Sequence, residues 1–409
     1  MSLNKLPLTP DYDAWLIDTD IADVSFTPRL VTVRWSDGRV SRYHSIWLRE
    51  NAADETTVNP ATRERILDLS TLPAWPEIDA VNIDAAGALC VTFAPENRRL
   101  RFHPGWLRAH DYDNATDSEA PLVPMNTWLG GPEVAPETLD ASGLLDTAPD
   151  SDAEEAILAP ALKSVLGKGL VRLRGLPTEP GSLESIARRI GPVRPTNFGQ
   201  LFNVKAKPDP DSNAYTSLAL PPHVDLPTRE YHPGLQMLHC LENSVKDGQA
   251  VMMDGFAVAE ALRDRHPEAW ATLTRVRWCY ANTARTTDYV WFEPMIRLDA
   301  RGELLLEVRI ADFLRGPLQT AFEDVEPAYE ALIILQRLLR DPAFAIRFTY
   351  RPGDLVIFDN RRLLHARDAF EGSTGHRWLQ GCYMERDEVR SRYRMFQRAR
   401  RQRQLTAET

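Results

Sequence analysis

The chain has 409 residues, 43% of them hydrophobic, and its 48 Lys and Arg against 58 Asp and Glu give a formal net charge of −10, so the length allows two domains that each bury a core. The negative charge argues against a nucleic-acid partner, which would need a basic surface. The four cysteines stand singly with no CxxC pair, which excludes a disulfide framework and a cysteine zinc cluster. No apolar run approaches the roughly 20 residues that span a bilayer, and the first residues lack the order of a signal peptide, so we expect a soluble protein of the cytoplasm that binds no membrane.

The first hundred residues predict short β-strands. Four runs rich in β-branched and aromatic residues alternate with turn signals, at residues 30–35, 39–44, 80–83 and 89–93. The first two flank Asp37-Gly38, a pair that suits the tight turn of a hairpin. We therefore expect a small N-terminal β-rich domain over residues 1–112.

The composition changes after this domain. Residues 113–150 are rich in Asn, Asp, Ser, Pro and Gly, which indicates a linker. In residues 151–409 the pattern predicts helices at 153–166, 182–190, 258–265 and 327–339, and strands at 169–173, 234–240, 250–253, 275–280, 304–310, 346–350, 355–358 and 378–383. Many short strands with few helices indicate a sandwich or barrel, so the expected fold class is mainly β with helices.

One short motif carries the first chemical signal. His223 and Asp225 stand two residues apart, and on an extended chain both side chains project from the same face. With a second histidine, His365, they could form the two-His, one-carboxylate triad of a non-haem Fe(II) oxygenase. Taken alone, such a motif is more often an N-cap aspartate beside a surface histidine than a pair of metal ligands.

Arg377 adds a second signal. It stands twelve residues after His365, on a predicted strand. Its planar guanidinium can bind a carboxylate through two parallel hydrogen bonds. A metal triad followed by such an arginine is less easily explained by surface residues than the triad motif alone.

The order of these motifs resembles a known family. The His-x-Asp pair, the segment GDLVIFDNRRLLHAR at 353–367 and Arg377 are similar to the Fe(II)/2-oxoglutarate dioxygenases of the taurine dioxygenase superfamily, and within it to the γ-butyrobetaine and trimethyllysine hydroxylase branch. Further similar segments are WLREN at 47–51, GLVRL at 169–173, PGLQMLHC at 233–240 and DGF at 254–256. Together they cover nearly the whole chain.

The resemblance implies a double-stranded β-helix, or jelly-roll, catalytic domain. His223, Asp225 and His365 would be the catalytic ligands of Fe(II), and Arg377 would bind the distal carboxylate of 2-oxoglutarate, with O2 as the other co-substrate. The implied reaction hydroxylates a C–H bond while 2-oxoglutarate becomes succinate. Two other functions stay open: a taurine-type dioxygenase that acts on a sulfonate or carboxylate, and a jelly-roll binding protein that retains metal without oxygen chemistry.

The resemblance also implies a small-molecule substrate with a trimethylammonium group. Relatives hold this group in an aromatic cage, and the corresponding positions here are Phe198, Phe202, Tyr215 and Tyr383. A quaternary ammonium has no N–H to donate, so it is attracted to ring faces. Any of these residues could instead be an ordinary core aromatic.

The anionic end of the substrate depends on other residues. Where γ-butyrobetaine enzymes present asparagines to a carboxylate, this chain has Asn213 near one position and Arg309 near the other. If Arg309 faces the pocket it favours a more highly charged anion, so we expect hydroxylation of 2-trimethylaminoethylphosphonate at the carbon β to nitrogen, with γ-butyrobetaine or trimethyllysine as alternatives. An Arg309 that points to solvent would remove this reason. Asn282 with Arg285 is another candidate pair.

The chain also departs from its relatives. Several relatives carry three cysteines after the segment that corresponds to 47–51, and these bind structural zinc with a histidine; residues 52–58 here contain none, so we expect no structural zinc. Ala250 stands where many members have Ser or Thr to hydrogen-bond 2-oxoglutarate, so another group must take that role. Relatives further suggest a homodimer.

Overall fold

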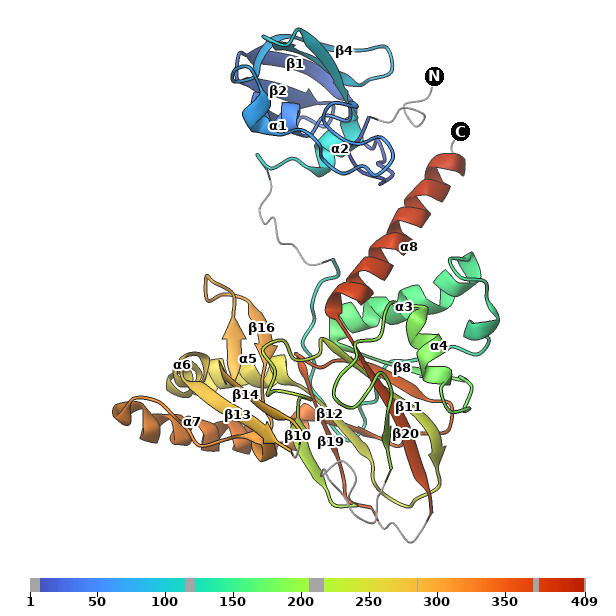
Figure 1. Ribbon diagram of the computed structural model, residues 1–409, viewed down its shortest axis with the longest axis vertical. Coiled ribbons are helices and arrows are strands. Elements are labelled where there is room, and N and C mark those ends of the chain that lie inside the picture. The colour runs from blue at the N-terminus through green and yellow to red at the C-terminus, as the bar shows by residue number, and fades with distance from the viewer. Residues whose placement is uncertain (1–7, 115–121, 206–216, 285, 371–374, 408–409) are drawn as a thin grey trace. The chain divides into compact units, whose positions relative to one another are not determined.

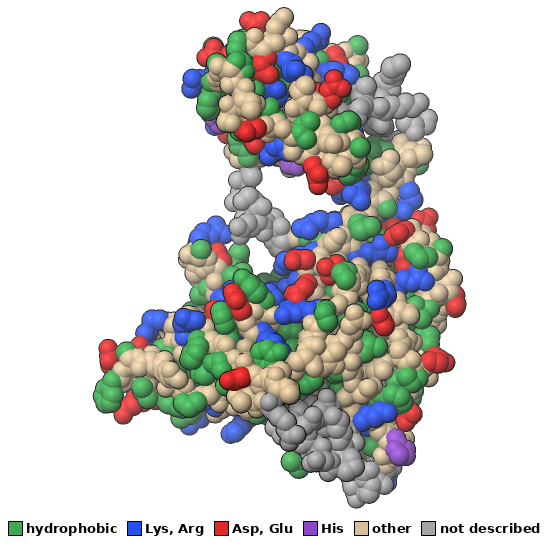
Figure 2. Space-filling view, in the orientation of Figure 1, with side chains coloured by type: hydrophobic (Ala, Val, Ile, Leu, Met, Phe, Trp, Pro, Cys, Tyr) green, Lys and Arg blue, Asp and Glu red, His purple; other side chains and the backbone are tan. Residues whose placement is uncertain are grey.

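The computed structural model describes residues 8–114, 122–205, 217–284, 286–370 and 375–407. The chain forms two compact units, one of residues 1–120 and 395–409 and the other of residues 121–394 (Figure 1). Among the described helices, none combines the length and apolar composition that crossing a membrane requires. Acidic and basic side chains are interspersed over the face shown in Figure 2.

The first unit contains two three-stranded antiparallel sheets. Their orders are β1-β2-β3 and β4-β5-β6, with the strands Ile21–Thr27, Leu30–Trp35, Val40–His44, Glu77–Ile83, Leu89–Ala94 and Arg98–Phe102. Helices α1 (Ser45–Glu50) and α2 (Pro104–Ala109) accompany them. Buried residues of both sheets, such as Tyr43 and Phe93, share one core. The predicted hairpin is confirmed, and Gly38 supplies the positive φ of 87° that its turn needs.

The second unit is built on two larger sheets. The first has the order β7-β8-β18-β11-β20-β9, with the strands Thr138–Asp140, Leu170–Arg174, Leu355–Asp359, Leu235–Asn243, Arg377–Met384 and Phe202–Val204. The second has the order β10-β19-β12-β17, with Leu220–His223, Leu363–Arg367, Ala250–Asp254 and Ala345–Phe348. One core cluster joins Leu238 and Val356 of the first sheet to Met252 and Ile346 of the second, so the two sheets pack face to face.

Helices cover the outer faces of this pair of sheets. Helix α3 (Asp152–Lys168) packs on β8, and α4 (Ser182–Arg188) packs on β20. On the other side (Figure 1), α5, α6 and α7 share a core with the outward-facing residues of β12 and β19. These three helices span Gly255–Arg265, Pro267–Arg275 and Val325–Leu338.

Two hairpins and a long helix complete the second half of the chain. Strands β13 and β14 form one hairpin, β15 and β16 form the other, and α8 follows β20. Their bounds are Arg277–Thr283, Asp288–Pro294, Ile296–Leu298, Leu305–Val308 and Arg386–Ala407. The connection between β13 and β14 reaches the cavity described below.

The sequence pattern predicts most of these elements; it misses strands β1, β6, β7, β9, β10, β14, β15 and β19 and helices α1, α2 and α6. Only residues 360–362 separate β18 from β19, and they include neither Gly nor Pro. The short Asp359-Asn360 pair is the one turn signal between the two strands. Strand β7 lies inside the segment 113–150 and pairs with β8. The division into residues 1–112, 113–150 and 151–409 stays a prediction.

A buried ion pair links α5 to the turn before β19. Nε and Nη2 of Arg362 lie 3.0 and 2.7 Å from the two carboxylate oxygens of Asp254, and both side chains are almost fully buried. Asp254 also accepts a hydrogen bond from the Phe256 amide in the first turn of α5.

We expect Arg362→Leu to lower the free energy of unfolding by about 3–5 kcal/mol, because Asp254 would stay buried without its counter-charge. Urea denaturation followed by circular dichroism would measure the loss. The control is Arg188→Leu, which removes an exposed pair with Glu184 and should change stability by about 0.5 kcal/mol or less. Equal effects of the two substitutions would contradict this account of the buried pair.

Candidate active site

Two strands of the four-stranded sheet bring the three predicted metal ligands together. In the register of β10 and β19, His223 stands opposite His365, and the two ring centroids are 4.0 Å apart. Oδ1 of Asp225 lies 3.3 Å from Nε2 of His223 and 3.6 Å from Nε2 of His365. One potential ligand atom from each residue lies within 4.8 Å of the others, a grouping found at no other place in the described residues.

The backbone at Asp225 is fixed by a buried asparagine. The side chain of Asn360 accepts a hydrogen bond from the Asp225 amide at 2.8 Å and donates to the Asp225 carbonyl at 3.1 Å. The side-chain amide of Asn360 also donates to the Pro233 carbonyl at 3.1 Å. Asn360 therefore holds the segment after β10 by its main chain and leaves the Asp225 carboxylate free to face the histidines.

The protonation states of the triad suit a divalent metal ion. Nδ1 of His223 lies 2.9 Å from the Pro221 carbonyl; as a donor there, it leaves the Nε2 lone pair facing Asp225. Burial, together with the neighbouring His223, lowers the pKa of His365 to about 3, so this ring is neutral. Burial raises the pKa of Asp225, but the nearby His365 and His223 outweigh it, and the resulting pKa lies well below the usual range.

These donors fit Fe(II). Two neutral imidazoles and one carboxylate on a single side of the ion form the facial triad, which leaves the remaining positions open to small ligands. The open positions here would face a cavity of about 620 Å³ that the three residues line.

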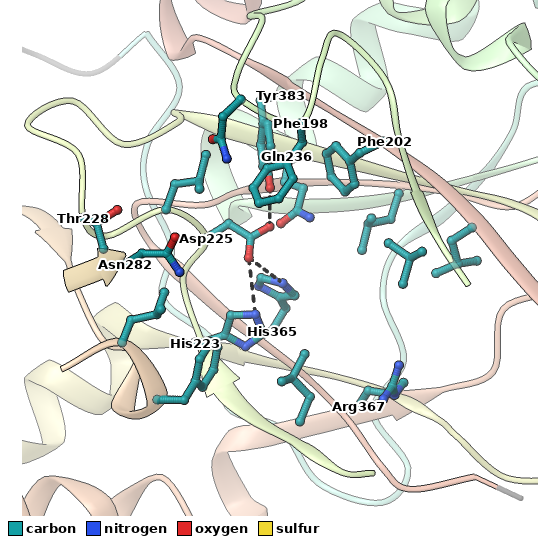
Figure 3. Close-up of a pocket in the computed structure, with 18 of the residues that line it drawn as sticks. Phe198, Phe202, His223, Asp225, Thr228, Gln236, Asn282, His365, Arg367 and Tyr383 are labelled. Atoms are coloured by element: carbon teal, nitrogen blue, oxygen red, sulfur yellow. Dashed lines mark hydrogen bonds and ion pairs between the residues drawn. The ribbon is translucent and has the colours of Figure 1, made fainter. Parts of the chain in front are cut away.

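Different chemistries meet around this cavity. Figure 3 shows Phe198, Phe202 and Tyr383 on one side of the triad, Thr228 and Asn282 on a second side, and Arg367 on a third. Among the described lining residues there are three arginines, Arg229, Arg367 and Arg377, and one carboxylate, Asp225. The cavity is therefore suited to anionic ligands.

Two of the arginines lie close together. The guanidinium carbons of Arg367 and Arg377 lie 4.9 and 5.9 Å from the centroid of the same Phe370 ring, and burial together with Arg377 lowers the pKa of Arg367 to about 10. Within the described residues, Nε of Arg377 and the hydroxyl of Tyr350 are buried without a hydrogen-bond partner. A buried and a partly buried cation beside a buried unpaired hydroxyl are stabilised when a carboxylate binds among them.

The aromatic side of the cavity depends on a glycine. The rings of Phe202 and Tyr383 stack with their centroids 4.9 Å apart, and Phe198 lies 6.4 Å from Phe202. A Cβ atom at Gly381 would lie 2.3 Å from the Phe202 ring, so only glycine admits this ring over β20. The hydroxyl of Tyr383 donates to Oδ2 of Asp225 at 2.7 Å, which joins the aromatic wall to the triad.

Seven of the ten predicted site residues line this one cavity: Phe198, Phe202, His223, Asp225, His365, Arg377 and Tyr383. Ala250 and Asn282 line it as well. Asn213, Tyr215 and Arg285 lie outside the described residues.

Arg309 does not face the cavity, so the expectation that it binds the substrate anion is wrong. Its side chain is 2% exposed, and its Nη2 lies 2.9 Å from Oε1 of the buried Glu307. Its Nη1 donates to the carbonyls of Pro227 and Arg229, at 3.0 and 2.7 Å. Neutralised by Glu307 and saturated with hydrogen bonds, Arg309 faces neither the cavity nor the solvent.

Several polar lining residues were not predicted from the sequence, and the four with the most direct bearing on ligand binding are Arg229, Gln236, Tyr350 and Arg367. One of them had a usable signal, because Arg367 stands two residues after His365 and thus on the same face of a strand. The other three come from segments whose approach to the triad depends on tertiary packing.

Known proteins resemble most of the chain. A family model described as "Taurine catabolism dioxygenase TauD, TfdA family" matches residues 135–383. A gamma-butyrobetaine dioxygenase from Pseudomonas sp. (strain AK-1) is 40% identical over 390 residues, which cover 95% of this chain and 99% of that protein. The gamma-butyrobetaine dioxygenase of Homo sapiens is 29% identical over 378 residues, covering 90% of this chain and 94% of that protein.

A trimethyllysine dioxygenase from Meyerozyma guilliermondii is 26% identical over 390 residues, covering 92% of this chain and 96% of that protein. The matched family segment includes the triad and Arg377. The chain therefore belongs to the TauD, TfdA family and is a dioxygenase that uses Fe(II) and 2-oxoglutarate.

Proposed function

We propose that this dioxygenase hydroxylates a short trimethylammonium carboxylate of the γ-butyrobetaine type, at the carbon β to the nitrogen. The observation that carries the proposal is the wall of Phe198, Phe202 and Tyr383 in the same cavity as the triad (Figure 3). Ring faces attract a quaternary ammonium by about 0.5–2 kcal/mol each. The relative with 40% identity, named for γ-butyrobetaine, supports the same substrate.

The preference for 2-trimethylaminoethylphosphonate is not supported. It depended on an Arg309 that faces the cavity, whereas Arg309 is paired with Glu307. The relatives described above are named for γ-butyrobetaine and trimethyllysine. Trimethyllysine is therefore the second candidate substrate.

The remaining residues of the site receive roles in this proposal. The two packed sheets correspond to the double-stranded β-helix, and His223, Asp225 and His365 hold the metal. Arg377 and Arg367 bind the distal carboxylate of 2-oxoglutarate, and the Tyr350 hydroxyl replaces the Ser or Thr that is absent at Ala250. Tyr350 and Ala250 line the same cavity as the two arginines, and the hydroxyl is buried without a partner in the described residues.

Bound Fe(II) and 2-oxoglutarate supply the oxidising chemistry: one atom of O2 enters the substrate C–H bond, the other enters succinate, and CO2 leaves. The chain supplies position and exclusion of water. The aromatic wall holds the trimethylammonium group, Tyr383 orients the Asp225 carboxylate, and Leu220, Met252 and Leu379 make the rest of the lining partly apolar. Such positioning aims a single C–H bond at the metal.

The proposal is tested by succinate release from 2-oxoglutarate with four substrates: γ-butyrobetaine, trimethyllysine, 2-trimethylaminoethylphosphonate and taurine. We expect the highest kcat/KM with γ-butyrobetaine. Turnover of taurine with no stimulation by any trimethylammonium compound would overturn the proposal and support a sulfonate dioxygenase instead.

Two substitutions of Tyr383 separate its ring contact with the substrate from its hydrogen bond to Asp225. We expect Tyr383→Ala to raise KM for γ-butyrobetaine roughly 5- to 30-fold, because a ring contact of about 1–2 kcal/mol is lost. Tyr383→Phe keeps the ring and loses only the hydrogen bond to Asp225, so KM should change by about threefold or less while Fe(II) affinity falls. Steady-state kinetics and Fe(II) titration measure the two effects. A similar KM for both variants would mean that the Tyr383 ring does not bind the trimethylammonium group.

We also propose a homodimer and the domain division given above, which the resemblance to the γ-butyrobetaine hydroxylase branch supports. Light scattering coupled to size exclusion tests the first: a particle of one chain mass would exclude the dimer. Expression of residues 1–112 alone, followed by circular dichroism, tests whether that segment folds as a domain.

A further inference from the structure

A third arginine lines the cavity away from the other two. Arg229 follows Asp225 by four residues and lines the cavity together with Thr228, with Asn282 near the end of β13, and with residues of the β13–β14 connection such as Thr286. Figure 3 places Thr228 and Asn282 on one side of Asp225, and Arg367 on the opposite side of the triad. The proposed 2-oxoglutarate end and this polar side are therefore separated by the metal ligands.

Arg229 has no carboxylate partner among the described residues. Its Nη2 donates to Oδ1 of Asn197 at 2.6 Å, its guanidinium carbon lies 3.1 Å from the centroid of the Tyr289 ring, and its Nε is buried without a hydrogen-bond partner there. Neither a neutral amide oxygen nor a ring face neutralises a guanidinium as a carboxylate does. A partly buried cation with an unused donor at a cavity wall is suited to an anionic ligand.

The backbone that carries Arg229 is fixed by hydrogen bonds from two buried side chains. Arg309 donates to the carbonyls of Pro227, Arg229 and Glu230, at distances of 3.0, 2.7 and 3.1 Å. Asn360 fixes the same segment at Asp225 and at Pro233. Because these contacts are buried or partly buried, the segment keeps its shape without a ligand, and little ordering cost is left for binding.

We propose that Arg229 binds the anionic group of the substrate, so that the substrate lies across the triad between the aromatic wall and Arg229. The inference rests on the proposed function, since it requires a substrate with a trimethylammonium group at one end. The fork of one guanidinium matches a carboxylate through two parallel hydrogen bonds. Arg229 thus takes the role of binding the substrate anion, which the sequence predicted for Arg309. Arg309 instead holds the backbone of the segment that carries Arg229.

The test compares γ-butyrobetaine with butyltrimethylammonium, which has the same cationic head and a chain of the same type but no carboxylate. Wild type, Arg229→Gln and Arg229→Lys are assayed for kcat and KM by succinate release. Dissociation constants come from the substrate-induced change in the anaerobic absorption band of the Fe(II) and 2-oxoglutarate complex. The matched control is Arg194→Gln, because Arg194 also contacts this region through the Tyr231 carbonyl but is absent from the described cavity lining.

For Arg229→Gln we expect KM and Kd for γ-butyrobetaine to rise about 10- to 100-fold, as for the loss of charge-assisted hydrogen bonds, with both constants for butyltrimethylammonium unchanged. Arg229→Lys should lie between wild type and Gln, and Arg194→Gln should behave as wild type. The inference fails if Arg229→Gln keeps the wild-type ratio between the two ligands, or if Arg194→Gln reduces that ratio equally.

The outcomes separate the inference from the proposed function. Wild-type turnover of γ-butyrobetaine with an unchanged ratio in Arg229→Gln would overturn only the role of Arg229. Absence of turnover with every trimethylammonium compound would overturn the proposed function itself. The same variants are also assayed with 2-trimethylaminoethylphosphonate; a loss confined to this substrate would mean that Arg229 recognises a phosphonate, and would overturn the assignment to a carboxylate.

Discussion

Replacing Asp225 by alanine is expected to abolish hydroxylation and to lower Fe(II) affinity by at least about a hundredfold. Loss of a group that merely orients a metal ligand typically costs 10- to 100-fold, and Asp225 is itself the anionic member of the triad. Without it, only two imidazoles remain, with ring centroids 4.0 Å apart, and no described carboxylate of the cavity lining can replace it.

The fold should survive this substitution. Asn360 holds residue 225 through its main-chain amide and carbonyl, and alanine keeps both groups. The measurement is an anaerobic titration of Fe(II) in the presence of 2-oxoglutarate, followed by its visible absorption band, with a thermal melt of the metal-free protein as the check on folding. We expect no band at Fe(II) concentrations that saturate the wild type, and an unchanged melt.

Asp368→Ala provides the matched control. Asp368 directly follows β19, and its carboxylate lies 3.5 Å from Nε of Arg347 with 45% of the side chain exposed. Removal of this carboxylate should leave Fe(II) affinity and turnover within about twofold of wild type, as expected for an exposed pair. A normal band in Asp225→Ala, or loss of the band in Asp368→Ala as well, would show that the triad does not hold the metal.

The parts of this site that could be predicted from sequence are those that follow from periodicity along one strand. His223 and Asp225 were found from their spacing, and Arg377 from its place on a predicted strand after His365. Their meeting depends on the register that sets His223 opposite His365. That pairing joins residues far apart in the chain, and neither segment specifies it alone.

The misplacement of Arg309 has a different physical cause. In a strand, Glu307 and Arg309 project from the same face, and that spacing of opposite charges indicates an ion pair as readily as a cavity-lining arginine. The structure adds the three carbonyl groups that come from the segment after β10. Because those acceptors belong to a distant part of the chain, the sequence around Arg309 contains no sign of them.

Arg229 shows the reverse case. No motif singles it out, since a lone arginine after a buried segment is usually solvated. Its place at the cavity follows from the turn at Leu226, whose φ is +55°, and from the contacts that hold residues 227–233. Only the tertiary structure therefore distinguishes Arg229, which lines the cavity, from Arg309, which is buried against Glu307 and the backbone of residues 227–230.

Arg377→Leu is expected to weaken 2-oxoglutarate binding by about a hundredfold or more. Two charge-assisted hydrogen bonds to a carboxylate contribute roughly 3 kcal/mol or somewhat more, and the neighbouring Arg367 restores part of this. The ligand-free protein should respond in the opposite direction. Arg377 is partly buried, and its charge contributes to the lowered pKa of Arg367, so a leucine removes a repulsion between like charges as well as a desolvation cost.

Thermal melts of the metal-free and the Fe(II)-loaded anaerobic protein, each with and without 2-oxoglutarate, measure both effects at once. A ligand that binds only the folded state raises its stability by an amount set by its concentration relative to Kd. We expect Arg377→Leu to melt at or above the wild-type temperature without 2-oxoglutarate and to lose most of the increase that 2-oxoglutarate causes in wild type. Arg347→Leu, on the exposed side of β17 with 44% of its side chain accessible, should keep the full increase.

Tyr350→Phe separates the contribution of the Tyr350 hydroxyl to 2-oxoglutarate binding from that of the Arg377 guanidinium. Because it removes one neutral donor and leaves both arginines, it should raise the Kd of 2-oxoglutarate about 3- to 10-fold, in line with a single neutral hydrogen bond. An unchanged Kd would mean that Tyr350 does not replace the missing Ser or Thr at position 250. A full 2-oxoglutarate-dependent increase in the melting temperature of Arg377→Leu would place the co-substrate carboxylate elsewhere, and the two adjacent arginines would then need another anion to account for their burial.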